Sequence, residues 1–104
     1  MDYYFNETDE GFPRRPYFEA SPKDTVAVVG SKVVLECLAN GSPKPRVTWL
    51  RDGVQVGSQG YSIFGESNLM ILSVSVENAG TYTCRASALN REEETTAKLE
   101  VHCE

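Results

Sequence analysis

The chain is poor in positive charge and in histidine, and both shortages exclude functions. Its 104 residues carry 10 Lys and Arg against 15 Asp and Glu, which gives a formal net charge of −5. A nucleic-acid partner is held through its phosphates by a basic face, so we expect no nucleic-acid binding. The only histidine is His102, close to the C-terminal end. A nucleophilic triad therefore lacks its usual base, and we expect no catalytic residues and no enzyme activity.

Long apolar runs, a secretory signal and short-range metal motifs are also missing. No run approaches the roughly 20 apolar residues that span a bilayer, so membrane attachment is expected only through a longer parent chain. The first ten residues lack the basic and apolar regions of a secretory signal, so the protein is either intracellular or a piece of a longer exported chain. No C-x-x-C pair and no glycine-rich loop before a helix occurs, and we expect no metal and no cofactor.

The three cysteines that are present are Cys37, Cys84 and Cys103. Cys37 and Cys84, which lie 47 positions apart, are the candidate disulfide. Closing a loop of that length stabilises a fold by about 4 kcal/mol in the chain-entropy model. Cys103 is left as an odd thiol, and we expect it either to mark a fragment boundary or to pair outside this domain.

Apolar and polar residues alternate in short runs after residue 16. Residues 1–16 show no such alternation and are predicted to be a flexible tail or linker. Further on, Gly, Pro, Asn and Asp separate the runs, and no segment keeps a 3.6-residue period over three turns. Strands are expected within residues 24–29, 31–39, 46–51, 61–64, 68–74, 81–88 and 95–101. Short strands at this spacing predict an all-β sandwich or barrel.

The largest side chains fall on inward positions of these strands. The predicted core positions are Cys37, Trp49, Leu69, Ile71, Tyr82 and Cys84. A cysteine pair on inward positions, with an indole between them in sequence, indicates two sheets joined by a bridge on which the indole packs. Tyr82 is expected to bury its ring while its hydroxyl bonds back to the turn near Glu77 and Asn78.

Several of these residues resemble an immunoglobulin domain of the intermediate (I) set. The resemblance rests on Cys37, "GSPKPRVTWLRDG" (41–53), "NLMIL" with Val74, and "NAGTYTC" (78–84), and covers about residues 18–101. It implies an immunoglobulin-like β-sandwich over residues 17–102, with two antiparallel sheets pinned by one disulfide and residues 103–104 ending the fragment. "YSIFGESNLMIL" followed by a Gly-x-Tyr-x-Cys strand is similar to the immunoglobulin repeats of neogenin-type netrin receptors.

The resemblance also implies a class of function. I-set domains form tandem arrays in cell-adhesion and guidance receptors and in giant muscle proteins. It therefore implies a non-catalytic recognition or spacer module, extracellular, in a cell-surface or secreted protein. Its partner would be another immunoglobulin-type surface, including a second copy, or a secreted guidance ligand. The alternative is an intracellular module of a sarcomeric or cytoskeletal protein, in which the same cysteines stay reduced.

One corner departs from the I-set pattern. The family commonly has Asp at the position of Asn78, paired with a base that opens the fourth strand. Here the corresponding positions are Gln59 and Gly60, so both charges are absent together. A single charge left in a partly buried corner would cost more than the pair contributes. Asn78 is expected to cap the turn through its side-chain amide, in a slightly weaker corner.

Two surfaces are candidate partner sites. An apolar face is predicted from Val34, Leu38, Met70 and Leu72, unless other parts of the chain cover them. A basic face of outward arginines is predicted from Arg46, Arg51 and Arg85, with a sulfated glycan or an acidic protein as partner. The consecutive acids Glu92, Glu93 and Glu94, predicted to form a solvated loop, would oppose a polyanion there.

Two N-x-[ST] sequons are candidate glycosylation sites. They begin at Asn6, in the predicted tail, and at Asn40, in a predicted turn between the second and third runs. Pro43 follows the second sequon and makes it a poorer acceptor. Asn40 followed by Gly41 is equally explained by turn formation.

Overall fold

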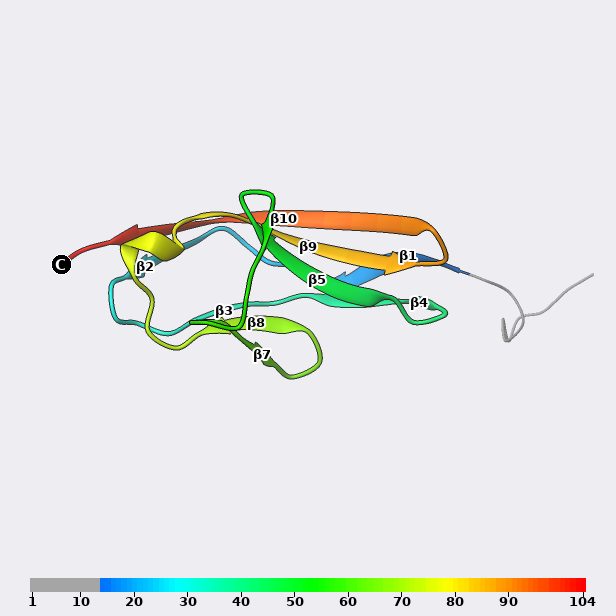
Figure 1. Cartoon of the computed structure of the whole chain (residues 1–104), viewed down its shortest axis with the longest axis horizontal. Helices are drawn as coiled ribbons and strands as arrows, with labels where there is room; N and C mark the ends of the chain where they lie inside the picture. Colours follow the sequence, from blue (N-terminus) through cyan, green and yellow to red (C-terminus); the bar gives the residue numbers. More distant parts are fainter. Residues whose placement is uncertain (1–13) are drawn as a thin grey trace, which may run out of the picture.

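The computed structural model describes residues 14–104, and strands make up nearly all of its regular structure (Figure 1). One 3-10 turn, η2 (Val76–Asn78), precedes the ninth strand. The strands are β1 (Arg14–Ala20), β2 (Thr25–Val28), β3 (Val33–Leu35), β4 (Leu38–Ser42), β5 (Arg46–Arg51), β6 (Val54–Gln55), β7 (Ser62–Phe64), β8 (Asn68–Ile71), β9 (Gly80–Ala88) and β10 (Arg91–His102).

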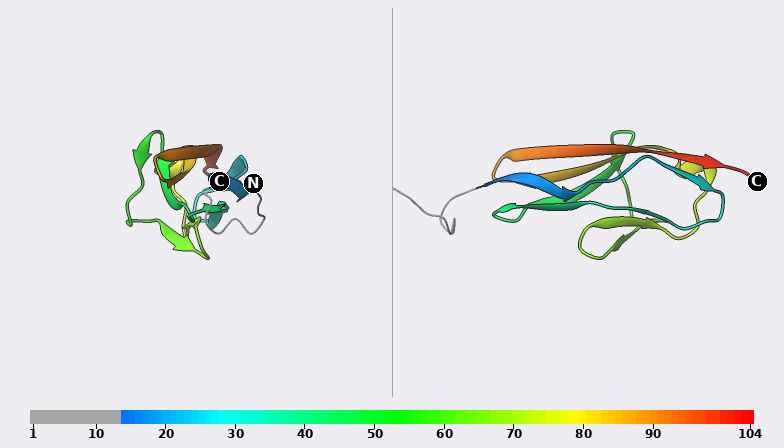
Figure 2. Two further views of the ribbon diagram at one scale, coloured as in Figure 1. Left: turned by 90° about the vertical axis from the view of Figure 1, so that its right-hand side faces the viewer. Right: turned by 180° about the vertical axis from the view of Figure 1, so that it is seen from behind.

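The strands form two facing layers (Figures 1 and 2). One layer is a five-stranded sheet in the order β2-β10-β9-β5-β6, in which β2 and β10 run parallel and the other pairs antiparallel. The other layer contains the three-stranded sheet β3-β8-β7 and the two-stranded ribbon β1-β4. The predicted β-sandwich is confirmed.

The N-terminal stretch of the sandwich changes layer. Strand β1 pairs with β4 in one layer, and β2 then pairs with β10 in the other. Pro22 is buried at the crossing between them. The tail predicted over residues 1–16 overlaps this strand, because β1 already begins at Arg14. The rest of that prediction, like Asn6, lies outside the described residues.

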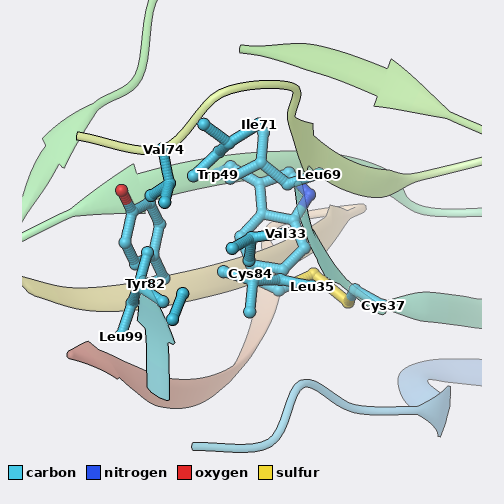
Figure 3. Close-up of a cluster of buried hydrophobic side chains, with 11 residues drawn as sticks. Val33, Leu35, Cys37, Trp49, Leu69, Ile71, Val74, Tyr82, Cys84 and Leu99 are labelled. Atoms are coloured by element: carbon cyan, nitrogen blue, oxygen red, sulfur yellow. A yellow bond between two sulfur atoms is a disulfide. The ribbon is translucent and has the colours of Figure 1, made fainter. Parts of the chain in front are cut away.

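The core lies between the layers, where apolar side chains from both sheets meet (Figure 3). Period-two alternation explains it, because each of these strands buries every second residue and exposes the others. Trp49 is 3% exposed, and Tyr82 and both bridged cysteines are 0% exposed. The buried side chains of the cluster are Ala27, Val33, Leu35, Cys37, Trp49, Leu69, Ile71, Val74, Tyr82, Cys84 and Leu99.

A disulfide joins the two layers through Cys37 and Cys84. The S–S distance is 2.04 Å and the two Cα atoms lie 6.6 Å apart. Trp49 packs beside this bridge, and its indole nitrogen donates to the carbonyl oxygen of Ser67 at 2.9 Å. The hydroxyl of Ser67 donates to the carbonyl oxygen of Cys37. The buried polar groups around the bridge therefore have partners, as a low-dielectric interior requires.

Candidate binding surfaces

The turn before β9 is held by Tyr82 and Asn78. The Tyr82 hydroxyl donates to the Asn78 carbonyl oxygen at 2.5 Å and lies 2.9 Å from the Tyr61 hydroxyl. The Asn78 side chain accepts from the Ser75 backbone N–H at 2.8 Å and donates to the Tyr61 hydroxyl at 3.1 Å. The amide thus caps the turn at one end and reaches Tyr61 at the other. Sequence reasoning found the cap but missed Tyr61, which lies where the family commonly has a base.

Arg51 supplies a positive charge to the same corner. Its guanidinium donates to the carbonyl oxygen of Glu77. Arg51 pairs in register with Tyr82 on β9, and Tyr82 faces the core, so Arg51 lies on the inward side of β5 rather than outward. The prediction that Arg51 belongs to an outward basic face is therefore wrong. The two-residue alternation after Trp49 carried this signal.

Loss of the Tyr82 hydroxyl tests this corner. We expect Tyr82→Phe to lower the free energy of unfolding by about 1–3 kcal/mol, because the carbonyl of Asn78 loses its donor. Burial raises the pKa of Tyr82, and the hydrogen bond with Tyr61 adds to the shift. A raised pKa in the folded state means full stability below the unfolded value of about 10 and loss above it. Urea titrations at neutral and alkaline pH measure both effects.

Tyr61→Phe is the matched control for this prediction. Its ring lies half-buried at the edge of the sandwich, so removal of its hydroxyl should cost less than the same change at Tyr82. The tilted Tyr61 and Tyr82 rings, with centroids 6.2 Å apart, keep their contact in both variants. Equal stability of wild type and Tyr82→Phe at neutral pH would contradict the role assigned to the hydroxyl.

The predicted apolar face is discontinuous. Val34 and Met70 are direct cross-strand partners on the outer side of β3 and β8. Leu72 follows β8 and is 67% exposed. Leu38 lies on β4 opposite Ala20 and is half-buried. The exposed Glu36 separates Val34 from Leu38 along the chain, so the structure brings together only one pair of the four.

The predicted basic face is also divided. Arg85 lies on the outer side of the five-stranded sheet, where its Nε is 2.7 Å from a Glu94 carboxylate oxygen and 3.9 Å from one of Glu92. The hydrogen bond from Arg85 to Glu94 raises the pKa of Arg85 and neutralises its charge locally. Arg46 stands at the far end of β5 from Arg51. The three arginines form no common surface.

The acids near Arg85 lie in a strand, which corrects the predicted loop. Glu92, Glu93 and Glu94 belong to β10 and pair in register with β9. The connection is the two-residue turn Leu89–Asn90, with φ of 50° and 63°. Two successive positive φ values are typical of the tight turns that match the twist of a hairpin. Alternation then places Glu92 and Glu94 on the face of Arg85, so they pair with it.

The Asn40 sequon lies in β4 and not in a turn. Asn40 pairs in register with Tyr17 of β1 and is half-buried. Its amide nitrogen donates to a Glu19 carboxylate oxygen at 3.3 Å, and its amide oxygen accepts from the Gly41 N–H at 3.0 Å. A side chain engaged in this way is a poor acceptor of a glycan.

The remaining candidate groups lie near the C-terminal end. Cys103 is exposed with a free thiol. The imidazole Nε2 of His102 is 2.7 Å from a Glu100 carboxylate oxygen, and both side chains are exposed. Over residues 14–104, no group of three or more His, Cys, Asp or Glu is arranged to hold a metal ion. The same range contains no helix that is long and apolar enough to cross a membrane.

The fold and its pinned core agree with comparisons to known proteins. Residues 15–88 match the family model described as immunoglobulin domain. The chain belongs to the immunoglobulin domain family. The netrin receptor DCC of Rattus norvegicus is 40% identical to this domain over 96 residues, which are 90% of the chain and 7% of the receptor. Protein turtle homolog B of Homo sapiens is 38% identical over 83 residues, 80% of the chain and 6% of that protein. The domain thus spans only a small part of each relative.

Solved structures similar to this immunoglobulin domain come from two settings. Tandem Ig repeats of Dlar match with a TM-score of 0.82 at 26% identity, covering 88% of this chain and 50% of that chain. A chain from a complex of titin M10 with a mutant obscurin-like 1 Ig domain matches with a TM-score of 0.82 at 27% identity, covering 88% and 97%. Homologues of this family are receptor or structural modules without catalysis, and this domain is a non-catalytic module homologous to domains of cell-surface receptors.

Proposed function

We propose that this domain is an extracellular module of a multidomain cell-surface or secreted protein, where it recognises another protein or spaces neighbouring modules. The observation that carries the proposal is the Cys37–Cys84 disulfide in a chain 40% identical to a netrin receptor. Disulfides persist in oxidising compartments and are rare in the cytosol. A small domain also needs such a bridge more than a large one, because it buries a smaller share of its surface.

The partner in this role is another protein. Immunoglobulin domains generally mediate protein–protein contacts, and we infer either an immunoglobulin-type surface, including a second copy, or a secreted guidance ligand. Adhesion or guidance would be the process served. The exposed edge of the Val34 and Met70 pair offers apolar area for such a contact.

A second candidate is an intracellular module of a sarcomeric or cytoskeletal protein. The chain of similar fold from the titin complex favours it, since it matches as well as the Dlar repeats do. In that setting Cys37 and Cys84 would remain thiols. The core would then be held by apolar packing alone.

Secretion separates the two candidates. We expect the chain, expressed behind a secretory leader in animal cells, to appear in the medium with one free thiol and an N-glycan on Asn6. Thr8→Ala should remove the glycan mass, whereas Ser42→Ala should leave it unchanged, because Asn40 is hydrogen-bonded within β4. Intact mass before and after glycosidase and reduction is the measurement. Secreted protein with neither bridge nor glycan would contradict the extracellular function.

A further inference from the structure

Half of the cationic side chains gather at one end of the sandwich. The start of β1, the connection from β4 to β5 and the turn from β9 to β10 meet there, at the right-hand end in Figure 1. Two open hollows of about 450 and 720 Å³ lie on either side of the exposed Leu89. The cations that line them are Arg14, Arg15, Lys44, Arg46 and Arg91, five of the ten Lys and Arg in the chain. We call these five residues the basic end.

Most charges of the basic end are not neutralised within the fold. Over residues 14–104, neither Arg15 nor Arg46 nor Arg91 makes an ion pair. Lys44 approaches a carboxylate oxygen of Glu66 at 3.1 Å, but both side chains are more than half exposed, and such pairs contribute little. Arg85 shows the contrast, since two carboxylates hold it on the sheet.

Glu92 is the acid beside the larger hollow. It lies on the outer face of the sheet, with its carboxylate 3.9 Å from Arg85. It therefore reduces the positive potential of the basic end on one side only. Concentrating like charges destabilises a compact state, while clefts lined by one sign of charge attract ions of the opposite sign. Nothing in the packing of the sandwich requires these cations, so a ligand is the physical reason that fits them.

The chemistry of the basic end favours an anionic polymer. Its cations are long, exposed and drawn from separate segments, so they can follow a flexible chain of anionic groups. Leu89 is the one large exposed apolar side chain among the residues lining the two hollows, whereas the centre of a protein interface usually carries an apolar or aromatic cluster. We propose that the basic end binds a sulfated polysaccharide of the glycosaminoglycan class. The proposal adds a ligand to the proposed function and relies on it only for access to the extracellular space.

The site differs from the one expected from the sequence. Arg46 is common to both, whereas Arg51 and Arg85 are engaged by the fold itself. Arg15, Lys44 and Arg91 take their place, and they are far apart in sequence. Four acids within residues 1–13 are joined directly to this end, so the polymer has to compete with them. The experiment therefore uses the whole chain.

Heparin is the probe, with a size-defined oligosaccharide titrated into the protein at several salt concentrations. We expect saturable binding that weakens as salt rises, because it releases counterions from the polymer. Arg15→Glu with Arg91→Glu should raise the Kd about tenfold or more, since two exposed cation–sulfate contacts become repulsive. Lys32→Glu with Lys98→Glu changes the net charge equally at exposed positions elsewhere and should change the Kd less than about twofold.

Three results would overturn the proposal. They are equal weakening by both double variants, equal binding of fully desulfated heparin, and no binding by the wild type even at low salt. Absence of binding would leave an acidic protein as the partner of the basic end. Matched melting temperatures of wild type and both variants show that the fold is intact. A failure here leaves the secretion experiment untouched, because bridge and glycan are measured without any polysaccharide.

Discussion

Replacing both Cys37 and Cys84 by alanine is expected to lower the free energy of unfolding by about 2–5 kcal/mol. The bridge closes a loop across 47 positions and connects the two layers at a point where neither cysteine is exposed. Its loss frees the unfolded chain and also removes contacts beneath Trp49. For a domain whose total stability is about 5–15 kcal/mol, the variant would be partly unfolded at physiological temperature. Urea unfolding followed by tryptophan fluorescence measures the change.

Cys103→Ala is the matched control for the bridge. This thiol is exposed and free, so its replacement should change stability by no more than about 0.5 kcal/mol. Wild type treated with a reductant should resemble the double variant, whereas Cys103→Ala should still lose stability on reduction. Unchanged urea midpoints for the double variant would show that the bridge does not support this fold.

Trp49→Ala is expected to cost about 3–5 kcal/mol, the largest effect of a single apolar substitution in this domain. The indole lies against the disulfide with residues of both layers around it, and its nitrogen donates to the Ser67 carbonyl. Alanine leaves a cavity and an unpaired carbonyl at once. Trp49→Phe should cost less, because the ring is largely retained while the hydrogen bond is lost. Circular dichroism during urea unfolding suits both variants, which lack the only tryptophan.

Leu72→Ala is the control for the loss of apolar volume. Leu72 is 67% exposed at the end of β8, so truncation should change the unfolding free energy by about 0.5 kcal/mol or less. A cost at Trp49 as small as the cost at Leu72 would mean that the indole is not packed on the bridge.

Alternation in the sequence predicted the core because the buried strands follow it strictly. Cys37, Trp49, Tyr82 and Cys84 all lie on inward positions of period-two runs, and burial fixes that register. The same rule, applied two residues beyond Trp49, places Arg51 on the inward side. Its charge suggested solvent instead, whereas the structure satisfies the guanidinium at the carbonyl of Glu77.

Strand β1 and the β9–β10 turn were beyond this kind of pattern. The start of β1, Arg14 to Pro16, has no alternation, and its pairing depends on Gly41 of β4. A Cβ on Gly41 would lie 3.2 Å from the carbonyl oxygens of both Arg14 and Arg15, so the approach of the two strands needs glycine there. Leu89 and Asn90 form a turn with positive φ, which Leu rarely adopts, and the residues around it carry no signal for such a turn.

The basic end could not be predicted for a different reason. Its cations come from β1, the β4–β5 connection and β10, and only the pairing of distant strands brings them together. A search for charge clusters along the chain finds the consecutive acids of β10 first. Those acids alternate between the two faces of the sheet, and Glu92 and Glu94 are occupied by Arg85.

A disulfide map of the protein purified from secreting cells tests the central claim most directly. Free thiols are alkylated without reduction, the chain is digested with trypsin, and linked peptides are identified by mass. We predict one linked pair, residues 33–46 with residues 52–85, that separates on reduction, and alkylation of Cys103 alone. Alkylation of both Cys37 and Cys84 before reduction, or a bridge from either of them to Cys103, would contradict a sandwich pinned between its two sheets.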